Sequence, residues 1–257
     1  MSLRAKAVST TKVGNFFAPN KHSAGYCGQK SGLSLTSPKI LSLGKMQASL
    51  LLRSLNRIFA RMKTANIFPE RHPLEPFLPA NARLLMLGSF PPQRHRWSME
   101  FFYPNLQNDM WRIVGYLATG DKAHFLAPDS KRFDRERIEA FCRERGIALY
   151  DTAVEVIRLK GNASDDSLQV VQPVDLAALL ARIPECRDIV TTGQKATDTL
   201  RAITGGGEPS IGDCTEFRFA GREMRLWRMP SSSRAYPRPV EWKAEFYRKV
   251  FETCGII

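Results

Sequence analysis

From residue 62 onward, short apolar runs alternate with amphipathic stretches, which predicts strands and helices in turn. The apolar run 83–88 ends in Gly88 and is typical of a buried parallel strand. Further strands are predicted at 147–151 and 187–192, and a hairpin at 215–219 and 223–229. Helices are predicted over 108–117, 133–144 and 174–182, from Gly193 through Ala202, and over 240–251.

This order of elements predicts the fold class. Strands that alternate with helices favour a single three-layer α-β-α domain with a central, mostly parallel, four-stranded sheet. Ligands bind such sheets at the carboxyl ends of the strands. The loops of interest are therefore those after Leu87, Leu149, Thr192 and Arg228.

The net charge of +13 is concentrated in the first 61 residues, which hold ten basic and no acidic side chains. The remaining 28 basic and 25 acidic residues nearly balance, so global charge is a poor argument for nucleic-acid binding. We interpret 1–61 as a basic disordered extension and 62–257 as the domain. Two alternatives for the extension are a transit peptide and a wrongly assigned start, with translation beginning at Met62.

The five cysteines, at 27, 142, 186, 214 and 254, contain no closely spaced pair. A structural zinc or an iron–sulfur cluster is therefore not expected, and the wide spacing favours reduced thiols in a cytoplasmic compartment. Organelle targeting is the alternative if the extension is genuine. No apolar run is long enough to span a bilayer. We expect a monomer without metal, cofactor or membrane partner.

Two early segments carry candidate chemistry. Gly88-Ser89-Phe90-Pro91-Pro92 follows a strand, where glycine admits a ligand close to the main chain and the prolines stiffen the turn. An ordinary tight turn explains it equally well. The stretch 101–111 places Phe101, Phe102 and Tyr103 before amides that include Asn108. Aromatic faces stack on bases and amides read base edges, although a helix cap also explains Asn108.

Two later segments add polar groups at the same predicted edge. Asp151 ends a strand and precedes the polar loop 161–167, which contains Asp166. Such carboxylates can hold water or a substrate hydroxyl, although a solvated turn also accounts for Asp166. After Met229, the segment 230–239 combines hydroxyls, arginines and prolines, which suits contacts with phosphates. A basic and aromatic cluster at 93–97 could also touch a DNA backbone.

Together these segments resemble the uracil-DNA glycosylase superfamily over roughly residues 80–252. The family's first motif, a strand ending in Gly-x-x-Pro, is similar to the segment 87–92, and its last motif, a strand followed by Pro-Ser, is similar to 229–233. The hypoxanthine-DNA glycosylase branch is the most similar. It shares Gly-Ser-Phe-Pro, an Asn-x-aromatic-Trp segment like 108–111, and an aromatic-Asp pair like Tyr150-Asp151.

The resemblance implies a monofunctional DNA glycosylase of base excision repair. It would flip a deaminated base, uracil or hypoxanthine, out of DNA and hydrolyse its N-glycosidic bond. The implied catalytic residues are Asn108, Asp151 and Asp166. The implied base-binding residues are Gly88, Ser89, Phe90, Pro91, Phe102 and Tyr103, and the implied DNA contacts are Ser231, Ser232, Ser233 and Arg234.

Two departures from the family pattern keep other interpretations open. Many members have a polar residue where Phe90 stands and His or Asn where Met229 stands, and neither residue here can replace them chemically. A catalytically weak or inactive DNA-binding module on the same scaffold is therefore the main alternative. A hydrolase of free nucleosides is a third, although no glycine-rich phosphate motif supports it.

Overall fold

The computed structural model describes residues 66–159 and 165–257, without the side chains of residues 66, 67 and 166. The boundary expected at residue 62 therefore lies outside the described residues. The described chain has a mixed α/β fold, as the sequence predicts. Its central sheet has the strand order β3-β2-β6-β8-β7, from β2 (Leu84–Gly88), β3 (Ile147–Asp151), β6 (Asp188–Thr192), β7 (Cys214–Phe219) and β8 (Arg222–Met229).

The prediction of a four-stranded central sheet is wrong in its strand number. Strands β3, β2, β6 and β8 are mutually parallel, and β7 adds a fifth, antiparallel strand beside β8. The predicted hairpin supplies this strand, because its turn at Ala220 and Gly221 folds β7 back along β8. Every residue of β2, β3 and β6 is buried, as expected for central strands covered on both faces.

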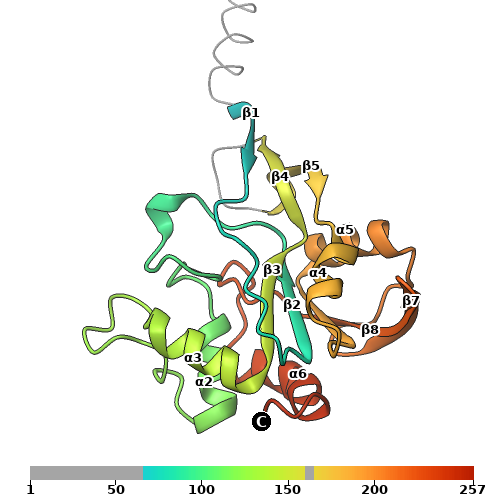
Figure 1. Ribbon diagram of the computed structural model, residues 1–257. Coiled ribbons are helices and arrows are strands. Elements are labelled where there is room, and N and C mark those ends of the chain that lie inside the picture. The colour runs from blue at the N-terminus through green and yellow to red at the C-terminus, as the bar shows by residue number, and fades with distance from the viewer. Residues whose placement is uncertain (1–65, 160–164) are drawn as a thin grey trace, which may run out of the picture. The chain divides into compact units, whose positions relative to one another are not determined.

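Helices cover both faces of this sheet. Helices α2 (Met110–Thr119) and α3 (Arg135–Arg145), which connect β2 to β3, lie on one face. Helices α4 (Leu176–Arg182) and α5 (Gln194–Thr204) lie on the other face, and Figure 1 shows the two pairs on opposite sides of β2 and β3. The closing helix α6 (Val240–Thr253) packs against α2.

A second, antiparallel sheet was not predicted. It has the order β1-β4-β5, from β1 (Asn66–Arg71), β4 (Ala153–Arg158) and β5 (Leu168–Pro173). Only Thr152 separates β3 from β4, so this sheet begins at the carboxyl end of β3, and Figure 1 shows it at the opposite end of the view from α6. A small separate core of Phe90, Ala153, Val156 and Leu168 lies beneath it.

Short 3-10 helices lie at Arg94–Arg96, in the connection after β2, and at Asp165–Ser167, between β4 and β5. No helix in 66–159 or 165–257 combines the length and apolar character that crossing a bilayer requires.

Candidate active site at the carboxyl ends of the strands

The four parallel strands end side by side, and their last residues form one edge of the sheet, called here the strand-end edge. Gly88 of β2 pairs with Asp151 of β3, and Thr192 of β6 pairs with Met229 of β8. The parallel register therefore brings together four loops that are far apart in the sequence. This edge is where ligands bind in folds of this type.

Gly88 and Asp151 fit closely against each other. A β-carbon at Gly88 would overlap the Oδ1 atom of Asp151, and it would also contact the ring of Tyr103 at 3.7 Å. The Asp151 carboxylate can occupy this position because Gly88 has no side chain. The next residue, Ser89, donates a hydrogen bond of 2.7 Å from its hydroxyl to Oδ1 of Asp165, which ties this turn to the loop before β5.

His72, which the sequence analysis did not single out, holds the Asp151 carboxylate from the interior. Its Nε2 lies 2.9 Å from Oδ2 of Asp151, and its Nδ1 lies 2.8 Å from the carbonyl oxygen of Leu74. The imidazole is completely buried, whereas the Asp151 side chain is 10% exposed. The buried imidazole therefore holds the carboxylate on its interior side, and a small part of the Asp151 side chain stays accessible to solvent.

Aromatic rings fix the position of His72. Its ring centroid lies 5.4 Å from that of Phe90, 6.2 Å from that of Phe102 and 4.6 Å from that of Tyr150. Such close aromatic packing restricts the ring to one orientation. Backbone hydrogen bonds add to this packing, because the N–H of His72 donates to the carbonyl of Val154 and the N–H of Thr152 donates to the carbonyl of Gly88. The main chain beside both His72 and Asp151 is therefore fixed.

The aromatic residues expected to stack on a base differ in their exposure. Phe90 and Phe102 are 8% and 4% exposed, and both pack inside the protein. Pro91 is also buried, and its carbonyl oxygen accepts a 2.6 Å hydrogen bond from Arg158. Tyr103 instead lies at the strand-end edge, with its hydroxyl 3.4 Å from Oγ1 of Thr192.

The environment of Tyr103 keeps its phenol protonated. Burial raises the pKa of Tyr103 well above its usual value, and the nearby Asp151 carboxylate raises this pKa further. The backbone of Tyr103 has a positive φ of 51°, which is uncommon outside glycine. A constrained, neutral phenol beside a carboxylate can donate a hydrogen bond to a ligand.

Asn108 lies just before α2, and its side chain is bonded to the first residue of that helix. Its Oδ1 accepts a 2.9 Å hydrogen bond from the backbone N–H of Met110, but the N-cap residue of α2 is Asp109, one position later than the helix-cap interpretation of Asn108 predicts. Its backbone forms an isolated bridge to Ser233, and Asp109 N–H donates to the carbonyl of Ser232 at 2.8 Å. The segment before α2 is thus joined to the serine loop, defined here as Pro230–Arg234.

A buried ion cluster secures the serine loop from below. Asp109 Oδ2 lies 3.0 Å from Nζ of Lys243, and Asp109 Oδ1 lies 2.8 Å from Nε of Arg234. Lys243 has no exposed side-chain surface and also donates to the carbonyl oxygen of Ser233 at 3.0 Å. This cluster joins α2, α6 and the serine loop, and the sequence analysis missed both Asp109 and Lys243.

The individual serines of this loop lie in different environments. Ser232 is buried, whereas Ser231 and Ser233 are partly exposed and Arg234 is exposed. Ser231 packs beside Gly193, where a β-carbon would come within 3.4 Å of the Ser231 β-carbon. The loop after β8 therefore lies against the start of α5 and borders the strand-end edge.

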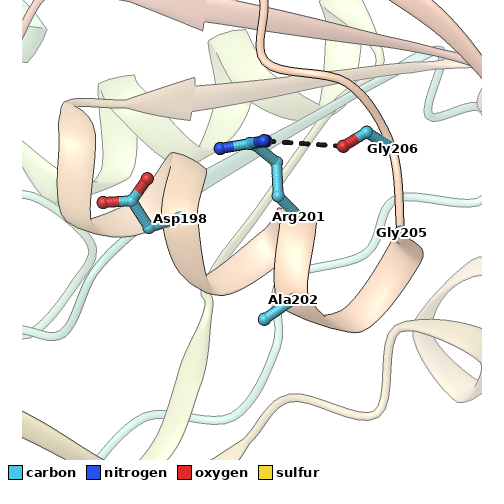
Figure 2. Close-up of a pocket in the computed structure, with 5 residues that line it drawn as sticks. All are labelled: Asp198, Arg201, Ala202, Gly205 and Gly206. Atoms are coloured by element: carbon cyan, nitrogen blue, oxygen red, sulfur yellow. Dashed lines mark hydrogen bonds between the residues drawn. The ribbon is translucent and has the colours of Figure 1, made fainter.

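Two hollows in the described surface lie away from the contact between Gly88 and Asp151. One, of about 360 Å³, runs along the later part of α5, and Figure 2 shows Arg201 of this helix bonded to the carbonyl of Gly206 there. The other, of about 250 Å³, lies between the end of the serine loop and the start of α6. Neither hollow is lined by Gly88, Asp151 or Ser231.

The polar groups of the edge suit acid–base chemistry. Asp151, Tyr103 and Thr192 lie together, and a carboxylate held in this way can accept a proton from water or stabilise a cation. Among the described residues, no group of three or more His, Cys, Asp or Glu side chains could hold a metal ion. The polar segment 161–164 and the side chain of Asp166 lie outside the described residues.

Together, the α/β fold and the strand-end edge define a protein with a candidate acid–base site at the ends of parallel strands. No protein-family model matches the chain, and no curated protein matches it. A solution NMR structure from Methanosarcina acetivorans, provisionally named a uracil DNA glycosylase, is similar at 24% identity with a TM-score of 0.46. The match covers 71% of this chain and 99% of that one. This likeness is below the level at which a shared family or activity follows.

Proposed function

We propose that the protein is a DNA repair glycosylase that hydrolyses the N-glycosidic bond of a deaminated base, uracil or hypoxanthine, flipped from DNA. The observation that carries the proposal is the Asp151 carboxylate, which is anchored by buried His72 and reaches the strand-end edge beside Gly88. Glycoside cleavage needs a fixed carboxylate near the sugar. Partial burial strengthens the electrostatic effect of that carboxylate.

In the proposed reaction, Asp151 orients the attacking water and stabilises the positive charge that develops on the sugar. The N-glycosidic bond breaks as the base leaves with the bonding electron pair. The water oxygen bonds to the anomeric carbon, and its proton passes to Asp151. The base takes up a proton, and the products are a free base and an abasic site. Asp166 stays a second candidate for this role.

The arrangement of the motifs supports membership of the uracil-DNA glycosylase superfamily, with the hypoxanthine-DNA glycosylase branch as the most similar. The motif at 88–91 begins at the last residue of β2 and the motif at 230–233 follows β8, and only β6 lies between these two strands. Two segments about 140 residues apart in the sequence therefore border one site. This is the arrangement that the resemblance requires.

We assign the remaining roles by where the side chains lie relative to the strand-end edge. Tyr103 is the aromatic residue that we assign to contact with the base, with Phe90 and Phe102 as its buried support. The side-chain amide of Asn108 reads the base edge, because its oxygen is already bonded to Met110. Ser231, Ser233 and Arg234 contact phosphates.

An oligonucleotide panel tests the activity. Duplex and single-stranded DNA with one uracil, hypoxanthine or mismatched base are incubated with the protein and treated with alkali to cleave abasic sites. We expect cleavage at uracil or hypoxanthine and none in undamaged DNA. Normal DNA binding without any abasic product would overturn the enzymatic proposal.

A second candidate function is a DNA-binding module with weak or no catalysis. The observation that favours it is the burial of Phe90 and Met229, which are 8% and 1% exposed and serve as core residues. The variants Asn108→Ala and Asn108→Asp separate the two functions. Asn108→Asp keeps the oxygen that accepts from the backbone N–H of Met110 and loses the amide donor. An enzyme should lose excision in both variants, whereas a binding module should change only in affinity.

A further inference from the structure

The hollow between the serine loop and α6, called here the arginine hollow, has the chemistry of an anion site. Arg234 and Arg238 line it together with Tyr236 and Pro239. The guanidinium of Arg238 lies 5.2 Å from the ring centroid of Trp242 and makes no ion pair with a described residue. The aromatic ring therefore orients a cation whose hydrogen-bond donors stay free.

Positive charge exceeds negative charge around this hollow. Asp109 lines it too, but its carboxylate is already shared by Lys243 and Arg234. Arg112 adds a further cation 4.0 Å from Asp109. Burial lowers the pKa of Arg112, and repulsion from Arg234 lowers this pKa further. The Asp109 carboxylate therefore lies within 4.0 Å of three cationic side chains, those of Arg112, Arg234 and Lys243.

The acidic groups nearby do not compensate this excess. Glu241, in the first turn of α6, is paired with Lys122 on the outer surface. The rings of Tyr236, Trp242 and Phe246 form a continuous row, with centroids 6.1 and 4.6 Å apart. A row of partly exposed rings beside free arginine donors is typical of a surface that binds a nucleic-acid strand.

We propose that the arginine hollow binds a backbone phosphate of the DNA strand that flanks the extruded nucleotide, with Arg238 as the main contact. This inference rests on the proposed function, because it assumes that DNA crosses the strand-end edge. The hollow lies directly after the serine loop along the chain, because its lining includes Arg234 and residues 236–240. A strand bound along that loop would continue into it.

The variant Arg238→Ala tests the contact. Binding of a fluorescent 12-residue oligonucleotide is measured over a series of salt concentrations. We expect affinity to fall roughly three- to tenfold at moderate salt, since an exposed charged contact is lost. The slope of log affinity against log salt should become shallower by about 0.7 to 0.9, which corresponds to one phosphate. Arg238→Lys should restore part of the affinity.

Arg218→Ala is the matched control, because it removes the same charge from an exposed side chain that lies beside the start of β8, at the opposite edge of the sheet. It should leave the affinity and salt slope unchanged. If Arg238→Ala has the same affinity and the same salt slope as Arg218→Ala, the proposal is overturned. The proposal is also overturned if Arg238→Ala weakens binding of a mononucleotide but not of the oligonucleotide, which would indicate a site for free phosphate.

The outcomes for the phosphate contact and for catalysis are separable. Reduced affinity of Arg238→Ala, with no excision by any variant, leaves the contact in place and removes the glycosylase function. Excision by the wild type with unchanged binding by Arg238→Ala removes only the contact. Wild-type protein that binds no DNA overturns both.

Discussion

His72 is the residue whose role in this account depends most on the three-dimensional structure. It lies 79 positions before Asp151 in the sequence, directly after the edge strand β1. Local pattern could not reveal it, because its importance comes entirely from a contact formed by folding. Asp151, in contrast, was predictable, since it ends a recognisable buried strand.

Replacing His72 should impair catalysis more than substrate binding. His72→Phe fills the aromatic cage but cannot donate to Asp151, so we expect kcat to fall roughly ten- to hundredfold. His72→Gln can still donate and should recover part of the rate. Steady-state kinetics with the best oligonucleotide of the panel measure both. A KM that rises while kcat is unchanged would contradict a positioning role.

Gly88 should tolerate no side chain. Gly88→Ala would push the new β-carbon against the Asp151 carboxylate, so we expect a loss of about 1–3 kcal/mol of stability together with loss of excision. Gly207→Ala is the control, since its β-carbon would meet only a Thr215 methyl group at 4.0 Å. Urea unfolding and the excision assay are run on both. Equal behaviour of the two variants would show that Gly88 does not position Asp151.

At the scale of elements, the sequence predicted the parallel core well because β2 and β3 are short, largely apolar runs. The predicted strand 147–151 coincides with β3, and the predicted 187–192 differs from β6 by one residue. The sheet β1-β4-β5 was missed because its strands mix buried and exposed positions, as in the pattern of β4. Its polar connection 161–164 also favoured a loop interpretation.

The contact between α2, α6 and the serine loop depends on the Asp109–Lys243 pair. Lys243→Met should destabilise the fold by about 3 kcal/mol, because it leaves a buried carboxylate with less compensation. Lys249→Met, on the same helix, removes a lysine that is 59% exposed and should have little effect. Urea unfolding at neutral pH compares the two. If Lys243→Met proves as stable as Lys249→Met, the cluster does not secure the loop.

At the scale of the whole molecule, the buried tyrosines predict a limit to alkaline stability. Burial raises the pKa of Tyr150 to about 12 and raises those of Tyr103 and Tyr247 further above the usual 10. Above pH 10 the unfolded chain releases phenolic protons that the folded chain retains. The contribution of these tyrosines to stability should therefore be complete below pH 10 and decline as pH rises towards 12. Urea unfolding between pH 8 and 11 checks this, and a constant free energy of unfolding above pH 10 would contradict it.

The overall architecture also explains which functional assignments the sequence could support. It predicted that four loops gather at one edge, since parallel strands share the direction of their carboxyl ends. It could not predict that Phe90 turns into a second core while Tyr103 stays at the edge. Side-chain direction in a loop depends on packing against elements that the local sequence does not reveal.

The most direct test of the central claim is the excision rate of Asp151→Asn beside that of the wild type, on DNA with a single uracil or hypoxanthine. The substitution keeps the size of the side chain and removes its charge. We predict excision by the wild type and a rate at least about 100-fold lower for Asp151→Asn, with unchanged affinity for DNA. Excision by Asp151→Asn at the wild-type rate would contradict the account.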